Sequence, residues 1–142
     1  MTHKEMAKGL LRQAESSLES AKRAADDGNW AFAVRTSQDA SELSIKALLL
    51  ATGNEPPKVH DLGKALHENR DDLQKLGLDG SEVHKMARMA RSLAEDRSKS
   101  LYGDEKKDIP ATKLYEQQDA RDAYTAASDI YSKCRGVVEQ DF

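Results

Sequence analysis

Apolar residues recur every three or four positions along most of this chain, and this spacing limits the possible fold more than any other feature. Steps of three and four place side chains on one face of an α-helix. The spacing is most regular near the end of the chain, in Ala120, Ala123, Tyr124, Ala127, Ile130, Tyr131, Cys134, Val137 and Val138. No segment alternates in the manner of a β-strand, and the 142 residues include only three prolines and eight glycines. The sequence therefore predicts an all-α protein.

Capping residues and glycines divide the chain into five expected helices. A side chain that can cap a helix precedes three of them, at Asn29, Asp61 and Ser81. We expect helices at about residues 4–25, 30–52, 61–76, 81–102 and 120–138, with a polar connection over residues 103–112. The first should bury Met6, Leu10, Ala14, Leu18, Ala21 and Ala25. We predict an up-and-down bundle of four long helices plus one short helix, in a single domain spanning residues 1–142.

Charge and composition exclude several classes of protein. The net charge of −3 gives no overall attraction to nucleic acid, so such binding would need a local patch. The longest apolar run, residues 47–51, is too short to span a membrane, and the N-terminus does not resemble a signal peptide. The lone Cys134 cannot form an internal disulfide. No two histidines have metal-binding spacing on a helix. We therefore expect a cytoplasmic protein without metal or cofactor.

Arg97 interrupts the apolar face of the fourth expected helix. It follows Val83, Met86, Ala90, Leu93 and Ala94 at helical spacing and precedes Leu101. A buried guanidinium keeps its charge and needs a carboxylate, a carbonyl or a ligand phosphate. Tyr102 and Asp104 follow at the helix exit. Arg97 is therefore either half of a structural ion pair or part of a binding site.

A charged strip runs along the second expected helix between two apolar shoulders. These shoulders are Phe32, Leu43 and Leu50 on one side and Val34, Ile45 and Leu49 on the other. The members of the strip are Arg35, Asp39, Glu42 and Lys46, which fall within about 60° of one another on a helical wheel. In one interpretation they form solvated pairs, Arg35 with Asp39 and Glu42 with Lys46. In the other they form a partly buried network in which Glu42 receives Arg97. The opposite side has small residues suited to close helix packing: Ala33, Ser37, Ala40, Ser44 and Ala47.

Basic residues gather on the other faces of the fourth helix and just beyond it. They are Lys85, Arg88, Arg91, Lys99, Lys106 and Lys107. A solvated helix face explains them, and so does a surface that contacts RNA. Arg91 is accordingly a candidate binding residue.

An ordered set of short motifs resembles the HEPN domain family. It includes Gly-Asn-Trp-Ala at residues 28–31, followed by Arg35, Glu42 and residues 46–49. It continues with residues 57–62, residues 94–97, residues 101–104, Ile109-Pro110, Tyr115 and Asp119-Ala120. The resemblance implies a helical bundle that forms a homodimer. It also implies a setting in RNA processing, toxin–antitoxin or defence loci, and a separate nucleotidyltransferase protein as partner.

Many domains of this family are metal-independent ribonucleases, in which an Arg is followed four to six residues later by a His. In this chain Tyr102 stands at the matching distance from Arg97, and no His follows His84. A phenol is a poor general base at neutral pH, although it can bind phosphate or stack on a base. Ribonuclease activity is therefore not the first expectation.

Three functional hypotheses remain. The leading one is a non-catalytic HEPN-like module that binds nucleotide, RNA or the nucleotidyltransferase. Its binding surface would combine Arg97, Tyr102 and Asp104 with Arg91 and the charged strip. The second hypothesis is a ribonuclease that uses Arg97 and Tyr102. The third is a structural dimerisation module in which the charges clamp the fold.

Overall fold

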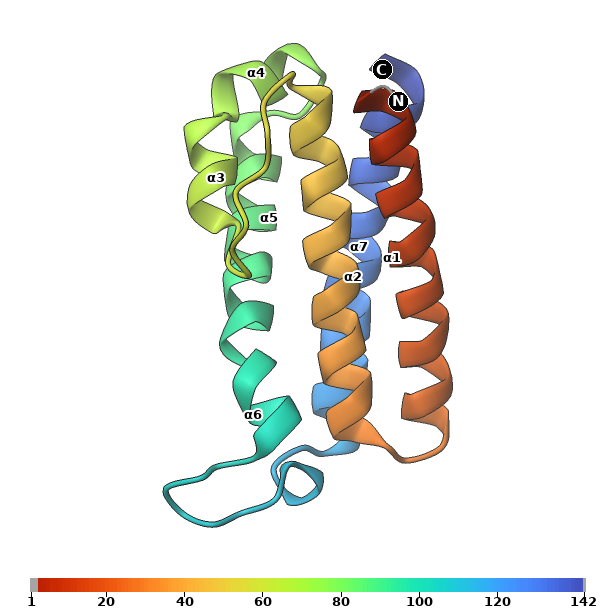
Figure 1. The fold of residues 1–142 in the computed structure, drawn as a ribbon, viewed down its shortest axis with the longest axis vertical. Coiled ribbons are helices and arrows are strands. Elements are labelled where there is room, and N and C mark those ends of the chain that lie inside the picture. Colours follow the sequence, from red (N-terminus) through yellow and green to blue (C-terminus); the bar gives the residue numbers. More distant parts are fainter. Residues whose placement is uncertain (1–2, 142) are drawn as a thin grey trace.

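A computed structural model describes residues 3–141, and it confirms an all-α bundle (Figure 1). Four long helices lie roughly side by side: α1 (His3–Asp26), α2 (Trp30–Ala51), α5 (Gly80–Glu95) and α7 (Gln117–Asp141). Three short helices and a 3₁₀ turn complete the described chain: α3 (Gly63–Glu68), α4 (Arg70–Lys75), α6 (Arg97–Tyr102) and η1 (Ala111–Lys113). The four long helices are those that the apolar spacing predicts.

Helix α2 lies at the centre of the bundle, with α1 and α7 on one side and α5 on the other (Figure 1). Its small residues allow close approach, as predicted: Ala33, Ser37, Ala40, Ser44 and Ala47 are completely buried. Larger side chains, including Ile45, Leu48 and Leu49, fill the rest of the core around it. This burial is the main favourable contribution to the fold.

The prediction for the inward face of α1 is wrong at its start and at its end, where Ala24 rather than Ala25 is buried. Ala14, Leu18 and Ala21 are buried as expected, but Met6 is 47% exposed. Ala7 and Leu11 are buried in its place. Apolar residues at positions 6, 7, 10 and 11 make a stripe two residues wide, and neighbouring residues differ by about 100° around the axis. The side that carries the smaller Ala7 faces the core.

Two expected helices are each divided in two. The short helix predicted over residues 61–76 breaks at Asn69 into α3 and α4. The fourth helix breaks at Asp96 into α5 and α6. The cap of α5 is Asp79 rather than Ser81: the Asp79 Oδ1 atom accepts from the Glu82 backbone N–H at 2.8 Å. The Glu82 Oε1 atom accepts from the Asp79 N–H at 3.3 Å, which completes a capping box.

A tight backbone turn follows α6. Gly103 has a φ of +77°, and Asp104 and Ile109 exchange two backbone hydrogen bonds of 2.9 and 3.0 Å. A Cβ atom at residue 103 would collide with the Ile109 carbonyl oxygen. Glycine is therefore required here by both conformation and space. Within residues 3–141, no helix has the length and apolar character needed to cross a membrane.

Candidate functional site on α2

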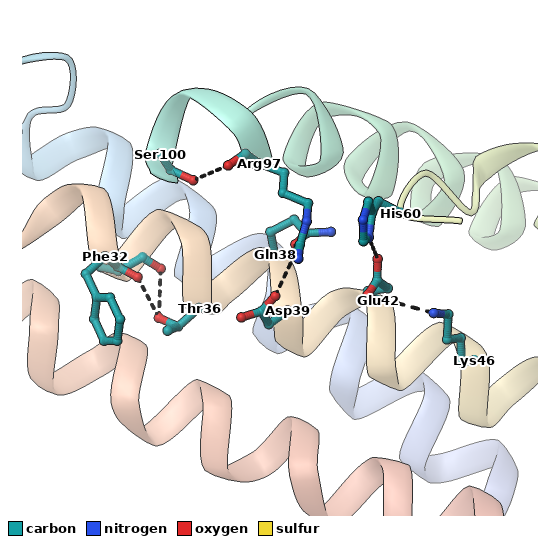
Figure 2. Close-up of polar contacts among 10 residues, drawn as sticks. Phe32, Thr36, Gln38, Asp39, Glu42, Lys46, His60, Arg97 and Ser100 are labelled. Carbon is teal, nitrogen blue, oxygen red and sulfur yellow. Dashed lines mark hydrogen bonds and ion pairs between the residues drawn. The ribbon is translucent and has the colours of Figure 1, made fainter. Parts of the chain in front are cut away.

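Arg97 is the first residue of α6, and it reaches across to α2 (Figure 2). Its Nη1 atom donates to the Gln38 Oε1 atom and the Asp39 Oδ1 atom, each at 2.8 Å. Gln38 is 1% exposed, and the Arg97 side chain is 26% exposed. The expected carboxylate partner for this half-buried charge therefore exists. It is Asp39, and the hypothesis that Glu42 receives Arg97 is wrong.

Glu42 has two other partners. Its Oε1 atom lies 2.6 Å from the His60 Nδ1 atom, and its Oε2 atom lies 3.8 Å from the Lys46 Nζ atom (Figure 2). The Glu42–Lys46 pair is as predicted. His60 comes from the segment between α2 and α3, where the sequence indicates only a helix start. Helical spacing holds no signal for this contact, because His60 belongs to a non-helical segment that folds back along α2.

Arg35 does not form the expected pair with Asp39, whose carboxylate binds Arg97 instead. The Nε atom of Arg35 is buried and has no hydrogen-bond partner among the described residues. We call Arg35, Asp39, Glu42 and Lys46, together with Arg97 and His60, the α2 strip. With neutral histidine the strip has three cations and two anions, so its formal charge is +1 although the whole chain is negative.

Two guanidinium groups of the strip have donors without an acceptor among the described residues. Arg97 makes both of its hydrogen bonds through Nη1 alone, and its Nε and Nη2 atoms have no acceptor among the described residues. Arg35 also makes no ion pair or hydrogen bond within residues 3–141; its Nε atom is buried, which leaves its Nη atoms as the donors for a ligand. A guanidinium presents several donors in a fixed plane that matches the oxygens of a phosphate. The strip can therefore accept an anionic ligand without losing the internal contact between Arg97 and Asp39.

Tyr102 and Asp104 lie on other surfaces. Tyr102 is 68% exposed and follows Arg97 by five residues, which places it about 140° around the helix axis. It borders a small hollow with Asp104 and two further acidic residues, Glu105 and Asp108. The Asp104 Oδ1 atom accepts from the Lys107 N–H at 3.1 Å and so supports the turn after α6. The structure therefore does not join Tyr102 and Asp104 to Arg97 in one surface.

A cavity of about 560 Å³ lies between α5, α6 and α7. Its rim includes Asp96, Asp119 and Asp122, and the Tyr115 hydroxyl donates to the Asp96 Oδ1 atom at 3.0 Å. Burial raises the pKa of the Asp96 carboxyl, and the hydrogen bond from Tyr115 acts in the opposite direction by lowering this pKa. Burial and the nearby Asp96 charge also raise the pKa of Tyr115. These carboxylates would repel phosphate, so the cavity does not extend the α2 strip as an anion-binding surface.

Arg91 lies on a third surface, in a hollow between α3 and α5. Its Nε atom is 3.8 Å from the Asp61 Oδ2 atom, and its side chain is 74% exposed. Asp61 follows His60 directly, so Arg91 lies near the α2 strip without belonging to it. Asp61 also accepts from the Gly63 N–H at 2.9 Å, but α3 begins two residues later than expected and its N-cap is Leu62, so the prediction of Asp61 as the cap is wrong.

The apolar shoulders of the strip are mostly inside the protein. Val34, Ile45, Leu49 and Leu50 are buried in the core, and Phe32 is 40% exposed. Cys134 is buried as expected, and burial raises the pKa of its thiol. In the part of the chain that the structure describes, no group of three His, Cys, Asp or Glu residues could hold a metal ion.

Comparison with known proteins found a matching family model and similar solved structures. The family model for the HEPN domain matches residues 7–137. Among solved structures, the chain is similar to the crystal structure of TT1696 from Thermus thermophilus, with a TM-score of 0.73 and 26% sequence identity. This likeness covers 96% of the present chain and 98% of the other. No curated protein matches the chain.

Proposed function

The chain belongs to the HEPN domain family, and from this membership we propose that it is a non-catalytic module that binds nucleotide or RNA through the α2 strip. Membership supports a nucleotide- or RNA-related role in general terms. The observation that carries the more specific proposal is the pair of arginines with unused donors. Arg35 has no protein partner among the described residues, and Arg97 is held in place through only one of its nitrogen atoms.

The internal contacts of the strip prepare it for a phosphate. Asp39 and Gln38 fix one edge of the Arg97 guanidinium, so little side-chain entropy is lost when a ligand binds the other edge. Lys46 and His60 are both held by Glu42, one helical turn further along α2. Hydrogen bonds between a guanidinium and a phosphate are charge-assisted and geometrically specific. The strip therefore supplies both attraction and orientation.

Arg35→Met tests this proposal most cleanly. The substitution removes the charge while it keeps the apolar stem, and it breaks no ion pair, so the fold should be unaffected. We expect a fluorescently labelled single-stranded RNA and AMP each to bind about tenfold more weakly. This change corresponds to the loss of about one charge-assisted hydrogen bond. Arg23→Met on α1 is the matched control and should bind as the wild type does. Unchanged binding by the Arg35→Met variant would show that the strip is not the binding surface.

Ribonuclease activity is a second candidate because the structure places a histidine on the strip. His60 binds Glu42 through Nδ1 and is 59% exposed, so a general base and Arg97 lie over the same face of α2 (Figure 2). In such a reaction the imidazole would take the proton from a 2′-hydroxyl, and Arg97 would stabilise charge on the phosphate. Tyr102, which the sequence suggests for this role, lies on another surface.

Incubation of the protein with single-stranded RNA in the presence of EDTA distinguishes the binding module from the ribonuclease. The binding proposal expects no cleavage by the wild type. Cleavage that His60→Gln abolishes and Tyr102→Phe leaves unchanged would establish the ribonuclease. If RNA and nucleotide both fail to bind, and Arg97→Met only reduces stability, the charges are structural and the chain is a dimerisation module.

Partners belong to the same proposal. We propose a homodimer and, as a protein partner, a separate nucleotidyltransferase of a toxin–antitoxin or defence type. Phe32 supports self-association because it is a large apolar side chain on α2, beside the strip, that is 40% exposed. Burial of its ring against a second copy would remove this apolar area from water.

A further inference from the structure

The hollow between α3 and α5 has a volume of about 640 Å³ and an excess of positive charge. Its cations are Lys64, Arg70, Arg88 and Arg91, and its anions are Asp61 and Glu68. Two histidines, His67 and His84, complete its charged and titratable lining. With both histidines neutral the formal charge of the hollow is +2, in a chain of net charge −3. Sequence spacing indicates only the residues on α5; the contributions of α3 and α4 come from the fold.

Close packing of α3 on α5 forms the base of this hollow. A Cβ atom at Gly63 would lie 3.2 Å from the Ala87 carbonyl oxygen, so glycine lets the two backbones approach. Leu62, Leu66 and Leu73 are fully buried and hold α3 and α4 against the core. Apart from Asp61, the charged and titratable side chains above this base are therefore carried by helices rather than by a loop.

The cations of the hollow are only weakly neutralised by the protein. Lys64 lies 3.7 Å from Glu68 and Arg91 lies 3.8 Å from Asp61, and these are exposed pairs of little energetic weight. Arg70 and Arg88 have no ion pair or hydrogen bond within the described residues. The rings of His67 and His84 lie 5.6 Å apart, between the two helices. Imidazole and guanidinium N–H groups can all donate to phosphate oxygens.

Two consecutive residues connect this hollow to the α2 strip. His60 contacts Glu42 on α2, and Asp61 contacts Arg91 on α5. The segment after α2 runs between the two helices on this side of the bundle, whereas α1 lies on the other side of α2 (Figure 1). A nucleic-acid strand that lies across residues 60 and 61 would therefore contact the α2 strip on one side and the hollow on the other.

We infer that the α3/α5 hollow binds the phosphodiester backbone of the same ligand as the strip, so that the preferred ligand is single-stranded RNA of several nucleotides. This inference rests on the proposed function of the strip. A mononucleotide carries its phosphate at one end and can occupy only one of the two surfaces. An RNA strand carries one phosphate per nucleotide and can neutralise both, with a correspondingly steep dependence on salt.

The double variant Arg70→Ala/Arg88→Ala tests the inference. Neither arginine has a protein partner among the described residues, and both are exposed, so the variant should fold. We expect single-stranded RNA to bind at least tenfold more weakly, with a shallower plot of log affinity against log salt, while AMP binding is unchanged. Lys22→Ala/Arg23→Ala on α1 removes the same charge on the other side of α2 and should leave both affinities as in the wild type.

The outcomes separate this inference from the proposed function. If Arg35→Met weakens AMP binding while Arg70→Ala/Arg88→Ala leaves RNA binding unchanged, the strip stands and the hollow has no part in binding. If the α1 control weakens RNA binding as much as the hollow variant does, the effect is general charge and the inference fails. If the wild type binds neither probe, both proposals fall.

Discussion

Arg97 and Asp39 lie 58 positions apart in the sequence and are joined by a 2.8 Å contact between Nη1 and Oδ1. The contact links the start of α6 to the middle of α2, and buried Gln38 supplies a second acceptor. Replacing one member of a half-buried ion pair destabilises a protein more than replacing both members, because the remaining charge is left without its partner. This asymmetry makes the contact informative in mutants.

Asp39→Ala and Arg97→Met should therefore each destabilise the protein, because each leaves a half-buried charge without its partner. We expect a loss of about 1–3 kcal/mol in the free energy of unfolding for Asp39→Ala, because the Arg97 charge loses its carboxylate. Urea denaturation measures both single variants and the double variant. A coupling energy of at least about 0.5 kcal/mol is expected, and strict additivity would show that the ion pair does not stabilise the fold.

Asp96→Asn should change how stability depends on pH. Because burial raises the Asp96 pKa, the folded protein binds this proton more tightly than the unfolded chain, whose carboxyl keeps its ordinary value of 3.8. Ionised Asp96 therefore opposes folding, and its contribution improves as pH falls through the raised pKa towards 3.8. Asparagine can still accept from Tyr115 and does not titrate.

Thermal unfolding from about pH 7 to about pH 4 provides the measurement. The stability of the wild type relative to Asp96→Asn should rise as the pH is lowered over this range. A difference that stays constant, or that moves in the opposite direction, would contradict the burial of this carboxyl beside Tyr115.

Gly103→Ala should destabilise the turn after α6. The residue has a φ of +77°, and an added methyl group would meet the Ile109 backbone oxygen. Both effects act in the folded state, so we expect a loss of about 2 kcal/mol or more in the free energy of unfolding. Gly136→Ala, in α7 with no heavy atom within 4 Å of an added Cβ, is the control. That variant should be at least as stable as the wild type, because alanine favours helix.

Self-association should depend on Phe32. Sedimentation equilibrium at tens of micromolar protein should show a dimer for the wild type, and Phe32→Asp should shift it towards monomer by placing a charge in the apolar contact. Val59→Asp, at another exposed apolar residue, is the comparison. A wild type that is monomeric throughout this range would refute the proposed homodimer.

Most of the fold follows from the sequence because helical spacing and turn residues are local signals. The long stripe of α7 and the small residues of α2 both appear in the structure as predicted. The break at Asn69 has no signal in the apolar spacing, which continues through it, and at Asp96 the spacing is interrupted only by Arg97, whose charge does not by itself indicate the end of a helix. Asp96 ends α5 where its side chain meets Tyr115, 19 residues further along the chain.

The candidate site could be predicted only in part. The need of Arg97 for a carboxylate follows from its charge within an apolar stripe. The sequence does not predict whether Asp39 or Glu42 is this carboxylate, because both lie on one face of α2. Which of them binds Arg97 depends on where α6 crosses that face. His60 has no periodic signal at all. Sequence spacing predicts Tyr102 beside Arg97, but on a helix that spacing turns the two residues apart.

Chemical-shift mapping by NMR tests the central claim most directly, namely that the α2 strip is the binding surface. Titration of isotope-labelled wild type with single-stranded RNA should shift the backbone amides of Arg35, Asp39, Glu42, His60 and Arg97. The amides of the exposed residues of α1 should stay in place, and the same titration of Arg35→Met should require about tenfold more RNA. Shifts confined to other helices, with the strip unmoved, would contradict the account.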